Sequence, residues 1–166
     1  MTDKIIFLDV DGVLTSTKET PGSYLNHSLD QYGISPSCLK NLKKLIADTG
    51  AKIIISSNWR IYRNQKQVEL HGKKIPNPLI AVCKELGEDV IDFLPKTAIK
   101  HKAEALVRWF DAHDFDGEFV VLDDDKEEHL DDEVLYSICD HLVFVNYKVG
   151  LQQSDCEKAK SILKVN

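Results

Sequence analysis

The sequence predicts an α/β fold, a three-layer, doubly wound (Rossmann-like) sandwich built on a mainly parallel sheet of about five strands. Two observations lead to this prediction. Short apolar runs rich in β-branched residues alternate along the chain with longer stretches of helical periodicity. The short runs are continuous rather than alternating in polarity, which is typical of strands buried on both faces of a parallel sheet. Such strands are joined by right-handed crossovers, and ligands collect at their carboxyl ends.

Each element can be assigned in chain order. Strands are expected at five apolar runs, which cover residues 5–8, 53–55, 90–93, 119–122 and 142–145. Ser35 and Pro36 offer an N-cap and a first helical residue to a helix that ends at Gly50. Further helices are expected from Pro78 to Gly87, over residues 102–113, and at a capping box formed by residues 154–157.

Length and composition indicate one globular domain. The chain has 166 residues, of which 43% are hydrophobic and 29% are charged, and these values suit a single packed core. The net charge of −6 argues against a broad, sequence-blind nucleic-acid surface but leaves room for a local basic pocket. No apolar run approaches the roughly 20 residues of a membrane helix, and the N-terminus leaves no room for a signal peptide. We therefore expect a single cytoplasmic domain over residues 1–166, with no membrane partner.

The cysteines agree with a reducing compartment. Cys38, Cys83, Cys139 and Cys156 are scattered, with no spacing typical of a metal site. Because they have apolar neighbours, they are expected to be buried free thiols.

The first strand is followed by two carboxylates. Asp9 and Asp11 lie two residues apart, so they point to the same side of an extended strand end, and Gly12 allows a tight turn or a close approach to a ligand. A carboxylate that ends a buried strand is costly without a cation or donors nearby. An Asp-rich turn is the alternative. A calcium loop of the EF-hand type is excluded, because Leu14 and Thr20 stand where its glycine and bidentate glutamate belong.

Two more strand ends carry polar residues. The second strand ends in Ser56, Ser57 and Asn58, where hydroxyl and backbone N–H groups are natural phosphate donors. The fourth strand ends in Asp123 and Asp124. Two acidic pairs at parallel strand ends form an oxygen-rich site that suits Mg²⁺, which prefers one or two carboxylates plus substrate phosphate. Each motif alone is also an ordinary turn signal or a solvated acidic run.

The order of these motifs, Asp-x-Asp, then Ser, then Lys, then Asp-Asp, resembles the haloacid dehalogenase (HAD) superfamily of phosphotransferases. The resemblance covers nearly the whole chain and involves four separated motifs. Ser-Ser-Asn-Trp-Arg at residues 56–60, Leu-Asp-Asp-Asp at 122–125 and Val-Gly-Leu at 149–151 are similar to a small capless group. That group resembles the phosphatase domains associated with nucleic-acid end repair.

The resemblance implies a role for each matching residue. Asp9 matches the nucleophile that forms an aspartyl-phosphate, and Asp11 matches the acid/base that protonates the leaving oxygen and later activates water. Ser56 matches the hydroxyl that binds the transferring phosphoryl group. The expected Mg²⁺ ligands are Asp9, the backbone carbonyl of Asp11, Asp123 and Asp124. Carboxylates can act as nucleophiles toward phosphoryl groups, and such transfer relies mainly on positioning and charge neutralisation.

Further contacts to the phosphorylated substrate are expected near these motifs. The basic residue of the superfamily follows the third strand, where Lys102 is preferred and Lys96 and Lys100 are the alternatives. Arg60 is a candidate because a guanidinium forks onto phosphate oxygens, and a surface arginine beside Trp59 is the alternative interpretation. The complete set of expected substrate-binding residues is Gly12, Ser57, Asn58 and Arg60.

The segments that carry caps in this superfamily are short here. Between Leu14 and Ser35 there is room for a flap, and between Trp59 and Val90 for one helix and a loop. That loop is rich in cations and amides: Arg60, Arg63, Asn64, Gln65, Lys66, Lys73 and Lys74. No separate cap domain is expected, so the site should be open, and open sites can admit macromolecular ends.

The resemblance implies a Mg²⁺-dependent phosphomonoester hydrolase. Nucleic-acid ends, free nucleotides, sugar phosphates and phosphoproteins all stand as candidate substrates, and nothing in the sequence indicates an oligomer. A receiver-like signalling domain is one alternative, but its phosphoacceptor Asp belongs on a middle strand, where this chain has Ser56 and Ser57. A catalytically inactive, Mg²⁺-binding HAD-fold interaction module is another. Asp11 disfavours dehalogenase chemistry, which needs no proton donor at that position.

Overall fold

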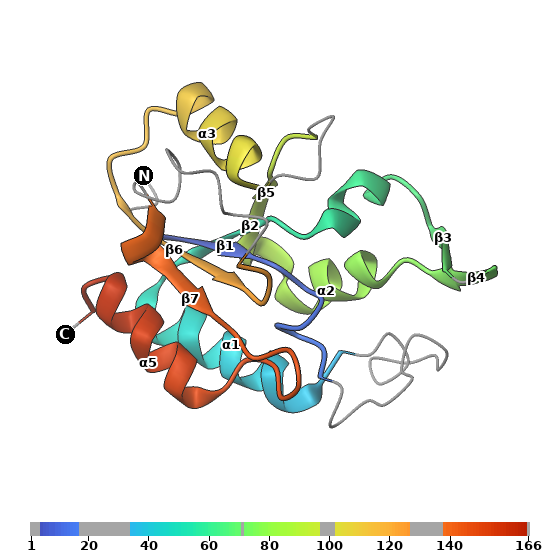
Figure 1. Ribbon diagram of the computed structural model, residues 1–166, viewed down its shortest axis with the longest axis horizontal. Helices are drawn as coiled ribbons and strands as arrows, with labels where there is room; N and C mark the ends of the chain where they lie inside the picture. The colour runs from blue at the N-terminus through green and yellow to red at the C-terminus, as the bar shows by residue number, and fades with distance from the viewer. Residues whose placement is uncertain (1–3, 17–33, 71, 97–101, 127–137, 166) are drawn as a thin grey trace.

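A computed structural model describes residues 4–16, 34–70, 72–96, 102–126 and 138–165. Its centre is a five-stranded sheet in the order β5-β2-β1-β6-β7, in which every pairing is parallel (Figure 1). The strands are β1 (Lys4–Leu8), β2 (Lys52–Ile55), β5 (Val90–Phe93), β6 (Glu118–Asp123) and β7 (Leu142–Phe144). The predicted α/β class with its parallel sheet is confirmed.

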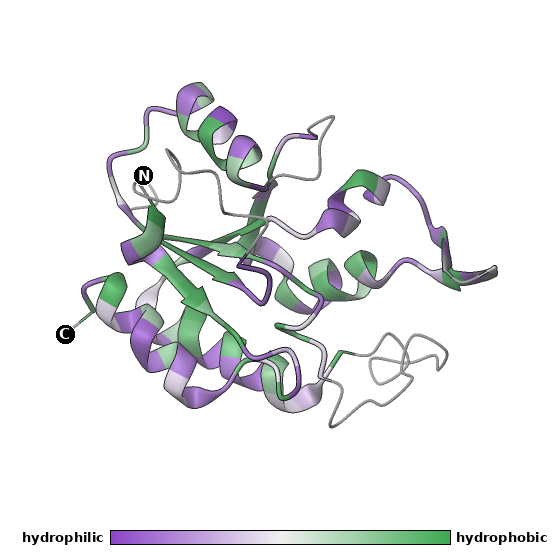
Figure 2. Ribbon diagram, in the orientation of Figure 1, coloured by the Kyte–Doolittle hydropathy of each residue, from purple (hydrophilic) through white to green (hydrophobic). Residues whose placement is uncertain are grey.

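Helices cover both faces of this sheet. α1 (Pro36–Thr49), α2 (Pro78–Leu86) and α5 (Gln153–Ile162) pack on one face, and α3 (Lys102–Ala112) packs on the other (Figure 1). Side chains alternate along β1, so Ile6 and Leu8 join the core under the three helices, whereas Ile5 and Phe7 join the core under α3. Figure 2 shows the resulting hydrophobic sheet between helices that carry hydrophilic residues.

The expectation of strands buried on both faces is right at the centre of the sheet and wrong at its edges. The apolar residues of β1 and β2 at 5–8 and 53–55 are at most 2% exposed. Ile91 of β5 is 49% exposed and Phe144 of β7 is 53% exposed. Both edge strands have a neighbour on one side only, and an apolar run does not distinguish an edge strand from a central one.

Both predicted ends of α1 and the predicted start of α2 are confirmed, whereas the predicted start of α5 is displaced. The Ser35 hydroxyl accepts a hydrogen bond from the Cys38 N–H at the start of α1, and Gly50 ends the helix in a left-handed conformation. α2 begins at Pro78, as expected. The capping box predicted at residues 154–157 is wrong by two positions, because the side chains of Gln152 and Asp155 form the reciprocal cap of α5.

The segment between Trp59 and Val90 contains more structure than the predicted helix and loop. It folds as the 3₁₀ helix η3 (Asn58–Tyr62), an antiparallel hairpin of β3 (Gln67–Leu70) and β4 (Lys73–Pro76), α2 and the short 3₁₀ helix η4 (Gly87–Asp89). Val68 and Ile75 pair across the hairpin, are buried and join the main core. The hairpin therefore has no separate core of its own, and it extends away from the sheet (Figure 1).

Other predictions meet the structure in part. The predicted flap falls mostly on residues 17–33, which lie outside the described residues, although Thr15 and Ile34 form an antiparallel bridge at its base. Cys38 and Cys156 are buried as expected, and Cys83 is half-buried. The prediction is wrong for Cys139, which is exposed as the first residue of the 3₁₀ helix η6 (Cys139–His141). In the described ranges, no helix has both the length and the apolarity needed to cross a membrane.

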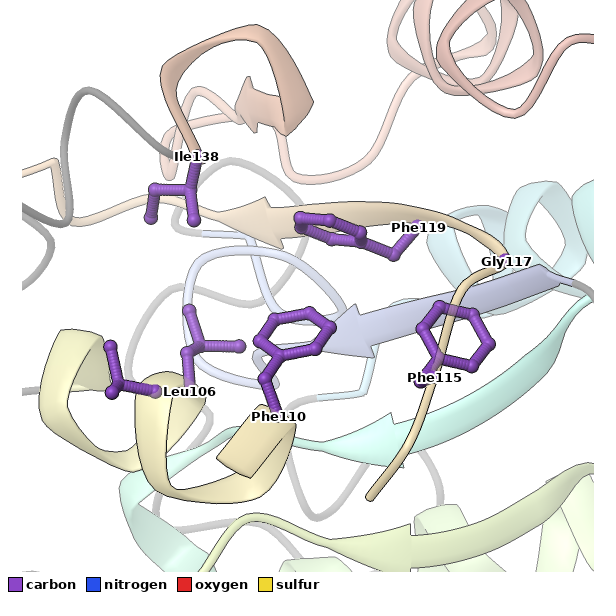
Figure 3. Close-up of a pocket in the computed structure, with 7 residues that line it drawn as sticks. Leu106, Phe110, Phe115, Gly117, Phe119 and Ile138 are labelled. Carbon is purple, nitrogen blue, oxygen red and sulfur yellow. The ribbon is translucent and has the colours of Figure 1, made fainter. Parts of the chain in front are cut away.

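An apolar pocket of about 250 Å³ lies on the α3 side of the sheet (Figure 3). Its lining consists of Leu106, Val107, Phe110, Phe115, Gly117, Phe119 and Ile138. Phe119 and Gly117 lie where the chain enters β6, so the pocket is separate from the carboxyl ends of the strands. None of the described residues that line this pocket has a nucleophilic, acidic or basic side chain.

Candidate active site

The strand register places three polar residues side by side. Leu8 pairs with Ile55 on one side and with Leu122 on the other. The same pattern continues past the strands, where the Asp9 N–H donates to the Leu122 carbonyl over 3.0 Å and the Ser56 N–H donates to the Leu8 carbonyl over 2.9 Å. The residues that follow the three paired positions therefore meet at one edge of the sheet: Asp9, Ser56 and Asp123.

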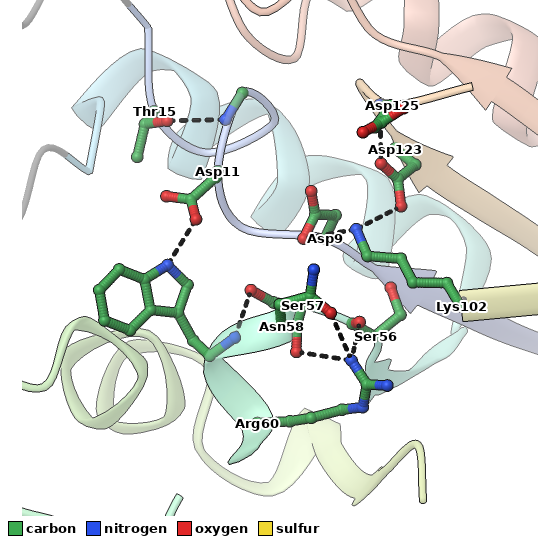
Figure 4. Close-up of polar contacts among 12 residues, drawn as sticks. Asp9, Asp11, Thr15, Ser56, Ser57, Asn58, Arg60, Lys102, Asp123 and Asp125 are labelled. Carbon is green, nitrogen blue, oxygen red and sulfur yellow. Dashed lines mark hydrogen bonds and ion pairs between the residues drawn. The ribbon is translucent and has the colours of Figure 1, made fainter. Parts of the chain in front are cut away.

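The alternation of side chains also places these three residues on the α3 side of the sheet. α3 begins at Lys102, and the Lys102 Nζ lies 3.2 Å from the Asp9 Oδ1 and 2.8 Å from the Asp123 Oδ2 (Figure 4). All three side chains of this ion-paired group are buried. Of the candidate lysines, Lys102 therefore contacts the acidic residues, whereas Lys96 is exposed and Lys100 lies outside the described residues.

Three carboxylates form a candidate cation site. Asp9, Asp123 and Asp124 each offer an oxygen, and these oxygens lie within 4.8 Å of one another. Burial raises the pKa of Asp9, and the nearby Asp123 raises it further, while Lys102 opposes both effects. Burial and Asp123 also raise the pKa of Asp124 to about 6. A hard divalent cation fits this donor set, because carboxylate oxygens are its preferred ligands and its charge would relieve their repulsion.

Gly12 allows Asp124 to join the group. The backbone at Gly12 has φ of 72°, and a Cβ at this position would lie 2.2 Å from the Asp124 Oδ2. The Gly12 N–H donates to the Thr15 Oγ1 over 2.7 Å, which closes the turn after β1. The close approach expected at Gly12 is therefore made by the Asp124 carboxylate, and a substrate contact there stays a prediction.

Asp11 lies apart from the three carboxylates and contacts a tryptophan. The indole Nε1–H of Trp59 donates a hydrogen bond to the Asp11 Oδ2 (Figure 4). Burial raises the pKa of Asp11, whereas the hydrogen bond from Trp59 lowers it. Among the described residues, the Asp11 side chain is thus outside the group of carboxylates that forms the candidate cation site, and its acid/base role stays a prediction. The metal contact predicted for its backbone carbonyl stays a prediction.

The Ser56 hydroxyl is a buried group that lacks a hydrogen-bond partner. Over the described part of the chain, Ser56 Oγ is the buried side-chain oxygen or nitrogen for which no partner is found. Buried hydroxyls are nearly always paired, so a hydroxyl beside Asp9 with no partner among the described residues is available to contact a ligand. The neighbouring Ser57 hydroxyl accepts from the Trp59 N–H at the start of η3, and the Asn58 side chain accepts from Arg60. Ser57 and Asn58 thus help to shape this turn, and their predicted substrate contacts stay predictions.

Arg60 is buried, so the alternative interpretation of this residue as a surface arginine is wrong. It is 2% exposed, and its Nη1 donates to the carbonyls of Ser56 and Ser57 over 2.9 and 3.2 Å. Its Nε donates to the Pro95 carbonyl over 3.4 Å, which ties the end of β2 to the segment after β5. The guanidinium therefore holds the polar turn after β2, and the predicted contact of Arg60 with a substrate phosphate stays a prediction.

Sequence reasoning did not identify several residues as parts of the site. Trp59 contacts Asp11, Thr15 closes the turn at Gly12, and the Asp125 N–H donates to the Asp123 Oδ1 over 2.9 Å. Trp59 stands within the Ser-Ser-Asn-Trp-Arg motif, and this position directly after a strand end was the available signal. The other two contacts depend on loop geometry that the sequence pattern does not specify.

The parallel sheet, the two acidic strand ends and the lysine at the start of α3 define a HAD-like α/β domain. The chain matches the family described as the HAD domain in Swiss Army Knife RNA repair proteins over residues 5–156, and it belongs to that family. This range contains every residue of the site from Asp9 to Asp125. Neither a curated protein nor a solved structure matches the chain.

Proposed function

We propose that this domain is a Mg²⁺-dependent phosphomonoesterase that removes the terminal phosphate from an RNA end through an aspartyl-phosphate at Asp9. One observation carries the proposal. The hydroxyl of Ser56, for which no partner is found among the described residues, lies beside a buried Asp9 that is paired with Lys102. A hydroxyl, an ammonium group and a nucleophilic carboxylate together are complementary to a phosphoryl group in transfer.

The first step transfers the phosphoryl group to Asp9. A carboxylate oxygen of Asp9 attacks phosphorus, and the bond between phosphorus and the leaving oxygen breaks. Asp11 donates its proton to that oxygen, so the RNA leaves as an alcohol. Lys102 and Ser56 contact the non-bridging oxygens, whose charge they stabilise.

The second step returns the enzyme to its starting state. Asp11, now a carboxylate, takes a proton from water while the water oxygen attacks phosphorus. The bond between phosphorus and the Asp9 carboxylate breaks, and inorganic phosphate is released. Asp11 is then protonated again and Asp9 is ionised again, so protons and charge balance over the cycle.

Asp9, Asp123 and Asp124 would hold the Mg²⁺ ion, which supplies positive charge beside the phosphoryl oxygens when it is bound. Lys102 also supplies positive charge beside the phosphoryl oxygens. Because it pairs with Asp9 and Asp123 at once, it keeps two buried carboxylates close together. The Asp125 N–H adds a donor to Asp123 and fixes the orientation of that carboxylate.

Two observations support an RNA end as the substrate. The family to which the chain belongs is described by its occurrence in RNA repair proteins. In addition, exposed cations follow the polar turn after β2, at Arg63, Lys66 and Lys74. With a net charge of −6, contact with a polyanion must be local, and these cations supply a local positive surface.

The proposal is tested by phosphate release from an oligoribonucleotide with a terminal phosphate. Release should require Mg²⁺, stop with EDTA and resume when Mg²⁺ is restored. Asp9→Asn should abolish it while the protein stays folded. Parallel assays with a DNA end, a mononucleotide, a sugar phosphate and a phosphopeptide identify the preferred class. Full activity in EDTA, or wild-type turnover by the Asp9→Asn variant, would contradict the mechanism, and preference for a sugar phosphate or phosphopeptide would contradict the RNA assignment.

A further inference from the structure

The contact between Trp59 and Asp11 joins two strand-end loops across the site. Trp59 belongs to η3 after β2, and Asp11 belongs to the turn after β1. In the described part of the chain, the hydrogen bond from the indole is the contact found for the Asp11 carboxylate, and it engages Oδ2. The second oxygen, Oδ1, has no protein partner among these residues.

The indole itself is held in place by several contacts. Trp59 is 9% exposed and packs in the core under α1, α2 and α5. Its backbone N–H donates to the Ser57 hydroxyl, and its ring lies 6.1 Å from the ring of Tyr62. A buried ring with fixed neighbours has few alternative orientations, so the hydrogen bond from its N–H holds the Asp11 carboxyl group in one orientation.

We propose that Trp59 is a positioning residue that assigns separate tasks to the two oxygens of Asp11. The inference rests on the proposed phosphatase function. An indole N–H is a hydrogen-bond donor and never an acceptor. The Asp11 oxygen that it contacts must therefore accept a hydrogen bond from the indole and cannot donate the acidic proton to it. Oδ2 therefore accepts from Trp59, and the proton resides on Oδ1. From Oδ1 the proton passes to the leaving oxygen as the bond between that oxygen and phosphorus breaks.

This arrangement predicts an effect that depends on the leaving group. A poor leaving group, such as an alkyl alcohol or the ribose of an RNA end, needs a proton as its bond to phosphorus breaks. A good leaving group, such as para-nitrophenolate, departs without one. Loss of the indole N–H should therefore slow alkyl phosphates selectively, because a misdirected proton donor affects only substrates that need it.

The test compares para-nitrophenyl phosphate with an alkyl phosphate in wild type and in Trp59→Phe. The quantity measured is the kcat/KM for the alkyl phosphate divided by the kcat/KM for the aryl phosphate, both with Mg²⁺. This ratio is used because kcat/KM reports the steps up to the departure of the leaving group. The alkyl substrate should lose about 10- to 100-fold relative to the aryl substrate. A ratio within one protein does not depend on the folded fraction, so partial unfolding of the variant cannot imitate the effect.

The chain offers a matched control. Trp109 is also buried, and its Nε1–H donates to the Asp92 Oδ2 over 2.9 Å, which is an equivalent pair away from the site. Trp109→Phe removes the same kind of hydrogen bond and should leave the ratio unchanged. In the Asp11→Asn background, Trp59→Phe should lower the ratio no further, because the donor that it positions is already absent.

The outcomes separate the two proposals. An unchanged ratio in Trp59→Phe, an equal loss on both substrates, or a further loss in the Asp11→Asn background would overturn the positioning role alone. A wild-type protein that hydrolyses neither substrate with Mg²⁺ would overturn the phosphatase function, and the positioning role with it.

Discussion

Asp124 shows how a single side chain can couple the candidate cation site to the backbone. Its carboxylate occupies the volume that a Cβ on residue 12 would fill, so the turn after β1 requires glycine there. The same carboxylate lies next to Asp123 and is half-buried, and burial and this neighbour raise the pKa of Asp124 to about 6. In the absence of a cation, an ionised Asp124 is therefore a source of repulsion in the folded state.

This repulsion gives the metal-free protein a defined pH dependence. Because the pKa of Asp124 is about 6 in the folded state against 3.8 ordinarily, the folded protein binds more protons between these values. Stability is thus highest at low pH within this window and falls as pH rises through about 6. With EDTA present, wild type should have a higher Tm at about pH 5 than at about pH 7.5.

Asp124→Asn removes this titration and should flatten the pH dependence of Tm in EDTA. The raised pKa of Asp9 contributes in the same direction, so the flattening should be partial. Mg²⁺ should raise the Tm of wild type more than that of the variant. An identical pH dependence of Tm in the two proteins would show that ionised Asp124 is not destabilised by repulsion from its neighbours.

At the scale of elements, the turn after β2 is held by contacts from three directions. Arg60 donates to carbonyls within the turn and to Pro95 after β5. Trp59 connects it to the turn after β1. Behind that turn, the Leu151 N–H donates to the Val13 carbonyl, and a Cβ on Gly150 would lie 2.9 Å from the Thr15 carbonyl oxygen. The close packing of three loops fixes the geometry at Asp9 and Ser56.

Arg60→Ala should destabilise the protein and reduce turnover on every substrate. It leaves buried carbonyls without donors, which costs about 3 kcal/mol. In a domain of this size, Tm should fall by roughly 6–12 °C. Arg63→Ala is the matched control, because Arg63 is exposed and its guanidinium lies over the Phe93 ring at 5.7 Å. Equal Tm values for the two variants would contradict the structural role of Arg60.

At the scale of the whole molecule, exposed cations lie on the segment that follows the polar turn after β2. The hairpin of β3 and β4 extends from the sheet beyond η3, and α5 lies on the opposite side of the molecule (Figure 1). Lys66 and Lys74 are exposed at this hairpin. Under the proposed function, these two lysines would contact the RNA chain beyond its terminal phosphate, while the exposed Glu69 opposite Lys74 reduces the positive charge of the hairpin.

Combined Lys66→Ala and Lys74→Ala substitutions should raise KM for an RNA-end phosphate and leave KM for para-nitrophenyl phosphate unchanged. The reason is that remote charges bind the nucleic acid without taking part in the transfer. Each lost phosphate contact on a single strand should lower the log–log salt slope by about 0.7. Lys158→Ala on α5 is the control and should have no effect. Equal changes on both substrates would contradict a docking role.

The sequence was sufficient for the features that depend on chain-wide patterns. The parallel sheet followed from continuous apolar runs, and the meeting of Asp9, Ser56 and Asp123 followed from strands that end at one edge. The burial of Arg60 could not be predicted, because arginines are mostly exposed and its acceptors are backbone carbonyls. The hairpin was missed because its strands are short and, among the side chains that the structure describes there, Val68 and Ile75 are the buried ones. The contact of Trp59 with Asp11 joins residues 48 positions apart and depends on the geometry of η3.

The central claim is that Asp9 carries the phosphoryl group, and acid-quench trapping with a radiolabelled RNA-end phosphate tests it most directly. Label should appear on the protein during turnover, be released by hydroxylamine as expected for an acyl phosphate, and map to the peptide that contains Asp9. It should accumulate in Asp11→Asn, which lacks the base for the second step, and be absent from Asp9→Asn. Label on another residue, or turnover with no trapped label in wild type and in Asp11→Asn, would contradict the account.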